Sequence, residues 1–80
     1  MAVLRLFAAA RTAAGTSRDH LPGATVADVL DAAVARYGDD FGAVLPTCAV
    51  WLNGEPVDRA ASVTADDEVA VLPPVSGGAR

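Results

Sequence analysis

The residues of this sequence whose types and spacing suggest chemistry lie near its C-terminal end, in the run Pro73-Pro74-Val75-Ser76-Gly77-Gly78. Proline lacks an amide hydrogen, so the diproline ends a strand and favours a stiff, extended exit. The next four residues pack poorly and reach roughly 13 Å. Because glycine has no Cβ, a partner enzyme can close a narrow channel around Gly77-Gly78 and admit the backbone to an interior active site. Glycine content alone is equally typical of an ordinary frayed terminus.

Few other residues suggest catalysis, and the best nucleophilic pair is the single histidine, His20, with the single cysteine, Cys48. We interpret His20 as a surface residue and Cys48 as a small hydrophobe. One cysteine cannot form an internal disulfide, and no Cys/His cluster has zinc spacing. We therefore expect no metal, no bound cofactor, no catalytic side chains of the chain's own, and a reducing, cytoplasmic location.

Composition narrows the class of partner. The 80 residues fit one domain, and their net charge of -4 argues against nucleic-acid binding. All six basic residues are arginine, so the chain offers no side-chain amine for acylation. Its apolar runs are far shorter than the roughly 20 residues that span a bilayer, and a signal-peptide pattern is missing, so we expect no membrane contact.

The elements that must position the tail follow from patterning. A strand is expected at 2–8, one or two helical turns at 8–14, and an exposed edge strand at 16–21. Apolar positions at helical spacing predict the main helix from Val26 to Tyr37. Thr25 and Asp28 suit its N-terminus, and Gly38 suits its C-terminus.

The second half of the chain is expected to be mostly strand. Residues 38–47 form a predicted loop, with Phe41, Val44 and Leu45 plugging the core. A strand at 48–52, an Asn53-Gly54 hairpin into an edge segment at 55–57, and a last strand at 68–72 follow. This order predicts an α+β, ubiquitin-like β-grasp with a mixed sheet and one main helix on one face. We expect a β-grasp domain at 1–74, with its first and last strands side by side at the centre, and a flexible tail at 75–80.

Alternation along the strands predicts a partner surface. If the helix covers one face of the sheet, Phe7, Trp51 and Leu72 point to the other face, beside Pro73. An uncovered apolar patch usually marks a protein interface, although Trp51 could instead lie under the loop of Phe41. An acidic surface would suit partners with basic rims. The positions expected to face the helix are Leu4, Leu6, Val50, Leu52, Val69 and Val71.

Four segments give nearly the whole chain a resemblance to the MoaD/ThiS sulfur-carrier family, and within it to the branch of the molybdopterin synthase small subunit (MoaD). The specific one is Asp67 to Gly78; the others are Leu4 to Arg11, Ala24-Thr25-Val26 and Val50 to Gly54. The resemblance implies that a ubiquitin-activating-type enzyme adenylates the Gly78 carboxylate with ATP, and that a sulfur donor converts the acyl-adenylate to a thiocarboxylate. It also implies a large synthase subunit (MoaE) that accepts the sulfur for the dithiolene of molybdopterin.

One departure is that the sequence continues past the diglycine with Ala79-Arg80. Adenylation of Gly78 requires their removal, and we expect a processing protease to trim them; a cloning remnant or a carrier that is not thiocarboxylated are the alternatives. The pathway also stays open, because thiamine, cysteine and natural-product synthesis use similar carriers. A protein modifier that acylates a target lysine, or a plain binding module, would be different functions of the same fold.

Overall fold

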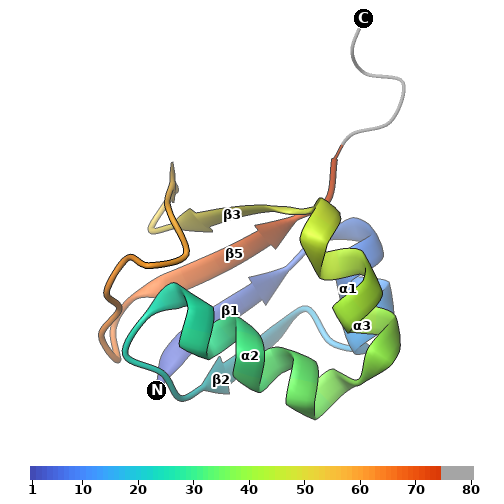
Figure 1. Cartoon of the computed structure of the whole chain (residues 1–80), viewed down its shortest axis with the longest axis horizontal. Coiled ribbons are helices and arrows are strands. Elements are labelled where there is room, and N and C mark those ends of the chain that lie inside the picture. Colours follow the sequence, from blue (N-terminus) through green and yellow to red (C-terminus); the bar gives the residue numbers. More distant parts are fainter. Residues whose placement is uncertain (75–80) are drawn as a thin grey trace, which may run out of the picture.

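The computed structural model describes residues 1–74 and contains one five-stranded mixed sheet with the strand order β2-β1-β5-β3-β4 (Figure 1). The central strands β1 and β5 are parallel, and the other neighbours are antiparallel. The predicted tail at 75–80, with its diglycine, lies outside the described residues. In chain order the elements are β1 (Ala2–Leu6), α1 (Ala8–Ala14), β2 (Arg18–Leu21), α2 (Val26–Tyr37), α3 (Asp39–Val44), the 3-10 turn η1 (Leu45–Thr47), β3 (Ala49–Leu52), β4 (Glu55–Pro56) and β5 (Glu68–Leu72).

The main helix α2 begins and ends where its capping residues predict. The Thr25 hydroxyl accepts a hydrogen bond from the Asp28 amide at 3.2 Å, and the Asp28 carboxylate accepts one from the Ala24 amide at 3.2 Å. These bonds satisfy amides that have no partner inside the helix. At the other end Gly38 has a positive φ of 97°, which turns the chain out of the helix. The prediction of this helix is confirmed.

The predicted loop at 38–47 is wrong, because this segment forms α3 and η1. Asp39 and Asp40 lie in the first turn of α3, where negative charge is favourable. The Phe41 ring is fully buried and packs edge-on against Tyr37, with ring centroids 5.2 Å apart. Leu45 is also buried, so the expected plugging of the core is correct, but it is made by a helix.

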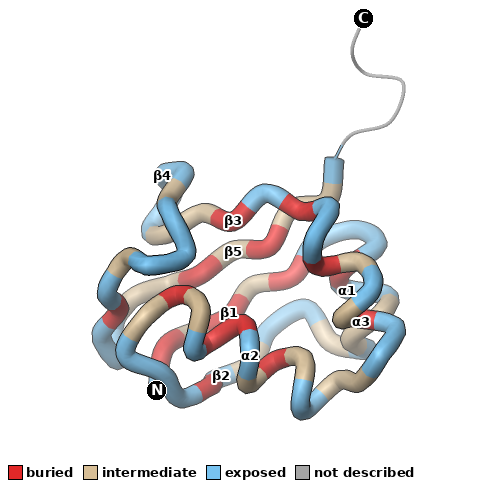
Figure 2. The backbone as a smooth tube through the Cα atoms, viewed as in Figure 1, coloured by how far each residue is buried: buried red, intermediate tan, exposed pale blue. Residues whose placement is uncertain are grey.

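The core lies between α2 and one face of the sheet (Figure 2). Side chains of β1, β5 and β3 alternate between buried and half-buried or exposed positions, as expected for a sheet covered on one side. No helix of residues 1–74 is long and apolar enough to cross a membrane. The largest fully buried side chains are Phe41, Leu4, Leu6, Leu30, Val26, Val29, Val69 and Val71.

The Asn53-Gly54 hairpin is confirmed, and it also fastens the start of β5. Both residues have positive φ values, 51° and 87°, which a tight two-residue hairpin requires. The Asn53 side-chain amide donates a hydrogen bond to the Asp67 carboxylate at 3.0 Å. Its side-chain oxygen accepts one from the Glu68 backbone amide at 2.9 Å. These bonds help to fix the register of β5 beside β3.

Candidate functional site

The base of the predicted tail is held at the centre of the sheet. Strand β5 has β1 on one side and β3 on the other, and its last residue, Leu72, is paired with Ala49 of β3. The Phe7 amide donates to the Val71 carbonyl oxygen at 3.3 Å, so the end of β1 is tied to the end of β5. Pro73 is half-buried and Pro74 is exposed. The chain therefore leaves the sheet from a fixed position.

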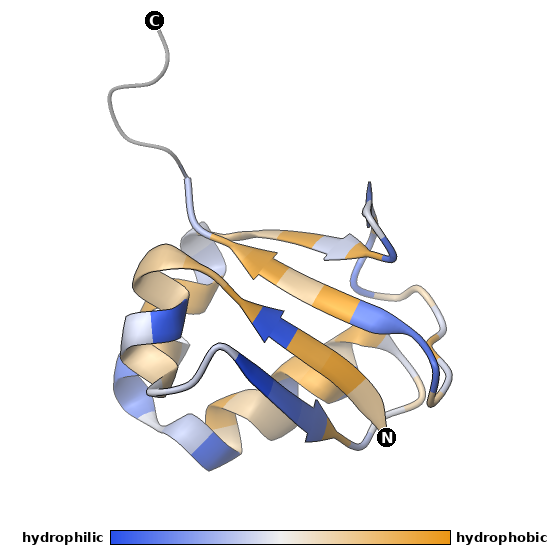
Figure 3. Cartoon of the chain, turned by 180° about the vertical axis from the view of Figure 1, so that it is seen from behind, coloured by the Kyte–Doolittle hydropathy of each residue, from blue (hydrophilic) through white to orange (hydrophobic). Residues whose placement is uncertain are grey.

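The sheet face opposite α2 is open. Seen from behind, β1, β5 and β3 carry no helix of residues 1–74 in front of them (Figure 3). Trp51 and Leu72 alternate with the buried residues Val50 and Val71, which places both on this open face, and both are half-buried. Phe7 follows β1 and is 40% exposed. We call the surface formed by Val3, Arg5, Phe7, Arg18, His20, Ala49, Trp51, Pro56, Glu68, Ala70 and Leu72 the open face.

Two predicted interface residues, Leu72 and Phe7, lie at the tail end of the sheet, and the third, Trp51, lies further along β3, opposite Ala70. Pro73 continues directly from Leu72. The alternative position of Trp51 under the segment of Phe41 is wrong, since Phe41 is buried on the α2 side of the sheet. Leu52 is only half-buried, but it packs against the core as expected. Whether the open face binds a partner stays a prediction.

Charged residues on the open face were missed in the sequence. Arg5 forms an ion pair with Glu68 at 3.1 Å, and its guanidinium lies 5.6 Å from the centroid of the Phe7 ring. The side chains of Arg5 and Glu68 are 40% and 42% exposed, so water screens this pair and it contributes about 0–1 kcal/mol. The signal in the sequence was a single charged residue, Arg5, within an otherwise apolar run. Such a residue indicates that this face of the strand carries a polar interaction.

His20 and Cys48 do not form a catalytic pair. His20 is exposed on β2 and Cys48 precedes β3, and β1 and β5 separate these two strands. At about 4.8 Å per strand spacing, the separation is roughly 14 Å. The Cys48 thiol donates to the Val44 carbonyl oxygen at 3.4 Å, and burial raises its pKa. Among residues 1–74 no group of His, Cys, Asp and Glu side chains is arranged to hold a metal ion.

The side chains of Asp19 and Tyr37, which both have shifted pKa values, lie on the α2 side and link α2 to β2. The Asp19 carboxylate accepts a hydrogen bond from the Tyr37 hydroxyl at 2.7 Å and forms an ion pair with Arg36 Nε at 2.8 Å. The Tyr37 hydrogen bond, the His20 amide and the Arg36 charge together lower the pKa of Asp19, against the opposing effect of its burial. Burial and Asp19 raise the pKa of Tyr37. Because its pKa is lowered, Asp19 stays ionised. We interpret it as a residue that stabilises the contact between α2 and β2 and not as one that transfers protons.

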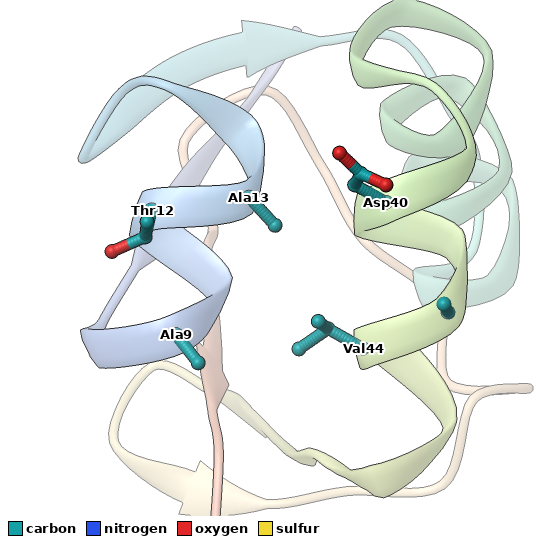
Figure 4. A pocket seen from close by; sticks show the side chains of 6 residues that line it. Ala9, Thr12, Ala13, Asp40 and Val44 are labelled. Atoms are coloured by element: carbon teal, nitrogen blue, oxygen red, sulfur yellow. The ribbon is translucent and has the colours of Figure 1, made fainter.

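A hollow also lies between α1 and α3 (Figure 4). Its lining has one charged side chain, Asp40 of α3; on the facing helix Ala13 points into the hollow, whereas the Thr12 side chain points away from Asp40. No second titratable group faces Asp40 there, so the hollow has no acid–base pair. The residues that line it are Ala9, Thr12, Ala13, Asp40, Ala43 and Val44.

The parallel central pair of strands, the helix across one face and the central exit of the chain define this protein as a ubiquitin-like β-grasp protein. Comparison with known proteins gives the family. The model of the ThiS family matches residues 4–78, which include the diglycine. The chain belongs to the ThiS family, the sulfur-carrier family that its sequence resembles.

Three relatives show how specific the similarity is. The chain is 41% identical to the molybdopterin synthase sulfur carrier subunit of Phaeosphaeria nodorum, over 90% of this chain and 84% of the relative. It is 40% identical to small archaeal modifier protein 1 of Haloferax volcanii, over 92% and 97%. The solution structure of small archaeal modifier protein 1 from Methanosarcina acetivorans aligns with a TM-score of 0.87 at 28% identity, over 96% and 95%. The first relative is, by its name, a subunit of a larger enzyme.

Proposed function

We propose that this chain carries sulfur as a thiocarboxylate on Gly78, most directly for molybdopterin synthesis. The observation that carries the proposal is the family match through residue 78, together with the 41% identical relative named as a molybdopterin synthase sulfur carrier subunit. The position of β5 at the sheet centre supports it, because the residues that precede the diglycine start from a rigid base.

The chemistry takes place on a chain that ends at Gly78, so the residues beyond it are first removed by a protease. A ubiquitin-activating-type enzyme joins the Gly78 carboxylate to the AMP part of ATP and releases pyrophosphate. Sulfide supplied by a sulfur donor then attacks the acyl carbon, the bond to AMP breaks and AMP leaves. The product is the thiocarboxylate, a soft nucleophile that donates sulfur to the substrate of a MoaE-like large subunit. In the activating step ATP is the partner's substrate, and this chain binds no cofactor.

This chain contributes position rather than catalytic groups. In the proposal, Val75, Ser76, Gly77 and Gly78 occupy a channel of the partner, while Phe7, Trp51, Leu72 and Pro73 rest against its surface. The buried Cys48 thiol and the hydrogen-bonded Asp19 carboxylate support a carrier that relies on its partners for catalysis. A side-chain nucleophile near the tail would compete with sulfur for the acyl-adenylate.

A protein modifier is the second candidate function, favoured by the 40% identity to small archaeal modifier protein 1. Activation of Gly78 would be the same, but a lysine amine of a target protein would displace AMP and form an amide. Sulfur transfer for thiamine, cysteine or natural products would differ from the main proposal only in the acceptor. The nucleophile that reaches Gly78 therefore separates these functions.

The test is reconstitution of a form that ends at Gly78 with the host's adenylating enzyme, ATP and a sulfur donor. Mass spectrometry should show replacement of one oxygen by sulfur. The full 80-residue chain is the matched control and should stay unmodified. Gly78→Ala should slow loading about a hundredfold, because a methyl group in the channel displaces the carboxylate by about 1 Å.

One result would reject the carrier, and another would reject only the argument that the partner's channel selects glycine. No thiocarboxylate on the parent, with amide adducts on target proteins instead, would establish the modifier. Equal loading of the parent and Gly78→Ala would remove the channel argument. Intact mass of the protein from its host should also show loss of Ala79-Arg80; retention of Arg80 in a protein that still transfers sulfur would contradict the mechanism.

A further inference from the structure

The strand β2 forms one edge of the sheet, and no strand of residues 1–74 lies on its outer side (Figure 1). The register shows which of its backbone groups point outward. The Leu6 amide donates to the Ser17 carbonyl oxygen at 3.0 Å. Antiparallel strands alternate between residues that exchange hydrogen bonds and residues that do not, so Asp19 directs its backbone groups toward β1. Arg18 and His20 therefore direct theirs outward.

The hydrogen bonds on the other side of β1 give the same assignment. The Phe7 amide donates to the Val71 carbonyl oxygen at 3.3 Å, so the amides of the odd-numbered residues in this part of the chain face β5. The amides of the even-numbered residues then face β2, and one of these residues, Leu4, is paired with Asp19. The inward position of the Asp19 backbone thus rests on two separate sets of hydrogen bonds.

The outward backbone groups of β2 are bonded to side chains of the same segment. The Thr16 hydroxyl donates to the Arg18 carbonyl oxygen at 3.0 Å and accepts from the Arg18 amide at 3.4 Å. The Asp19 carboxylate accepts from the His20 amide at 2.8 Å. Free backbone groups on a sheet edge are a template for pairing with another strand. On β2 these side chains occupy the positions that another strand would use.

The Asp19 carboxylate is held over the edge by the helix α2. Its Oδ1 atom bonds the His20 amide, whereas its Oδ2 atom accepts from the Tyr37 hydroxyl at 2.7 Å and pairs with Arg36 Nε at 2.8 Å. The Asp19 side chain is only 19% exposed. One carboxylate therefore joins α2 to β2 with one oxygen and covers the strand edge with the other.

Charge also opposes the pairing of two copies along β2. In a symmetric antiparallel pair of β2 strands centred on Asp19, Arg18 of each copy would lie opposite His20 of the other. Directly opposed residues attract when their charges are opposite, and this pair offers no such attraction. Pairing would also break the hydrogen bonds of Thr16 and Asp19 to the edge.

The other edge of the sheet is closed by different means. Strand β4 has only two residues, Glu55–Pro56, and proline has no amide hydrogen to offer to a new strand. Short edge strands and edge prolines both discourage pairing between molecules. Strand β2 is longer and contains no proline, so its side-chain hydrogen bonds take over this role.

We propose that Thr16 and Asp19 close the outer edge of β2 against a second copy of this chain. Without these two side chains, the β2 strands of two copies would join antiparallel and form one continuous sheet. Asp19 is then both a contact between α2 and β2 and a guard of the sheet edge. This role is independent of the chemistry at Gly78.

The test compares two double variants of the 80-residue chain by sedimentation equilibrium. Thr16→Ala with Asp19→Ala removes both covering groups, whereas Thr16→Ser with Asp19→Asn keeps a hydroxyl and a side-chain oxygen in their places. In high salt, which screens Arg18, the alanine variant should have a dimer association constant at least about tenfold above that of the parent. The serine–asparagine variant should stay within about twofold of the parent.

Amide hydrogen exchange locates the surface that associates. In dilute solution the Arg18 and His20 amides should exchange about tenfold faster in the alanine variant than in the parent, because their side-chain acceptors are gone. At high protein concentration their exchange in the alanine variant should slow again, since the second copy covers them. Slowing at other strands without slowing at Arg18 and His20 would place the association elsewhere and overturn the proposal.

Tyr37→Phe separates an opened edge from a less stable fold. It removes one hydrogen bond of Asp19 but leaves the His20 amide bonded, so it should lower the Tm and stay as monomeric as the parent. Equal association of Tyr37→Phe and the alanine variant would show that lost stability causes association, and it would overturn the proposal.

The single variant Thr16→Ala tests the same edge if the double alanine variant does not fold. It leaves the contact of Asp19 with α2 intact, and Thr16→Ser is its matched control. Thr16→Ala should associate more strongly than Thr16→Ser in high salt. Folded alanine variants that stay as monomeric as their matched controls would overturn the proposal.

Discussion

Trp51 and Val50 are neighbours in β3 that point to opposite faces of the sheet, and they offer a sharp test of the open face. Replacing Trp51 by alanine should weaken binding to the adenylating enzyme and leave the fold intact. A tryptophan covers about 150–250 Å² when fully buried, so docking on the half-buried Trp51 would remove about 100 Å² from water. At about 25 cal/mol per Å² this area corresponds to ~2.5 kcal/mol.

Part of that free energy is offset by the entropy lost when side chains become ordered at the interface. We therefore expect Trp51→Ala to reduce the binding free energy by about 1–3 kcal/mol, which raises Kd about 5-fold to 150-fold. Val50→Ala is the control. It removes two methyl groups from a buried position, which should lower the free energy of unfolding by about 2 kcal/mol and leave the Kd of the folded protein unchanged.

Calorimetry gives Kd for both variants, and urea unfolding gives their stabilities. An unchanged Kd for Trp51→Ala would refute the assignment of the open face as a docking surface. A loss of stability as large as that of Val50→Ala would show instead that Trp51 belongs to the core of the folded domain.

Two further predictions concern the fold that holds the site. The Tyr37 hydroxyl is the largest cause of the lowered pKa of Asp19, so Asp19 contributes stability above the ordinary aspartate pKa of about 3.9 and loses it as pH falls through its lower folded value. Tyr37→Phe should therefore cost about 1 kcal/mol at pH 7, and urea unfolding should show this difference shrinking at acid pH; a pH-independent loss would contradict this reasoning. Gly23→Ala should lower the Tm more than Gly42→Ala. A Cβ at Gly23, where φ is +155°, would lie 2.8 Å from the Val29 amide nitrogen. A Cβ at Gly42 would lie 3.3 Å from a Val34 methyl group. Equal Tm values from thermal melts would show that the backbone at Gly23 relaxes freely.

Most of the fold was predictable because local signals and long-range packing agree in this sequence. Thr25, Asp28 and Gly38 define α2 by satisfying or ending its backbone hydrogen bonds, and Asn53-Gly54 defines the hairpin by its positive φ values. The helix α3 was missed because Gly38 interrupts the helical period and the segment is only six residues long. The helix is stabilised by the burial of Phe41 beside Tyr37. This is a tertiary contact, which helix propensity does not predict.

The candidate site was predictable only on its apolar side. Alternation placed Trp51 and Leu72 on the open face because a strand has a period of two residues. The pairing of Arg18 with Arg5 depends on the register between β1 and β2, which a sequence pattern does not fix. Gly78 lies outside the described residues.

The arrangement of β5 explains why recognition and chemistry can be separate in such a carrier. Ala70 and Leu72 lie on the open face, and the diproline Pro73-Pro74 follows Leu72 directly in the chain. A partner that grips the open face therefore also fixes the origin of the tail. Four residues of fully extended chain span at most about 13 Å, which would be enough to enter a channel that excludes water. Trp51 would then govern KM, whereas Gly78 would govern the rate of the chemical step, and a Trp51 variant that changed only kcat would refute this separation.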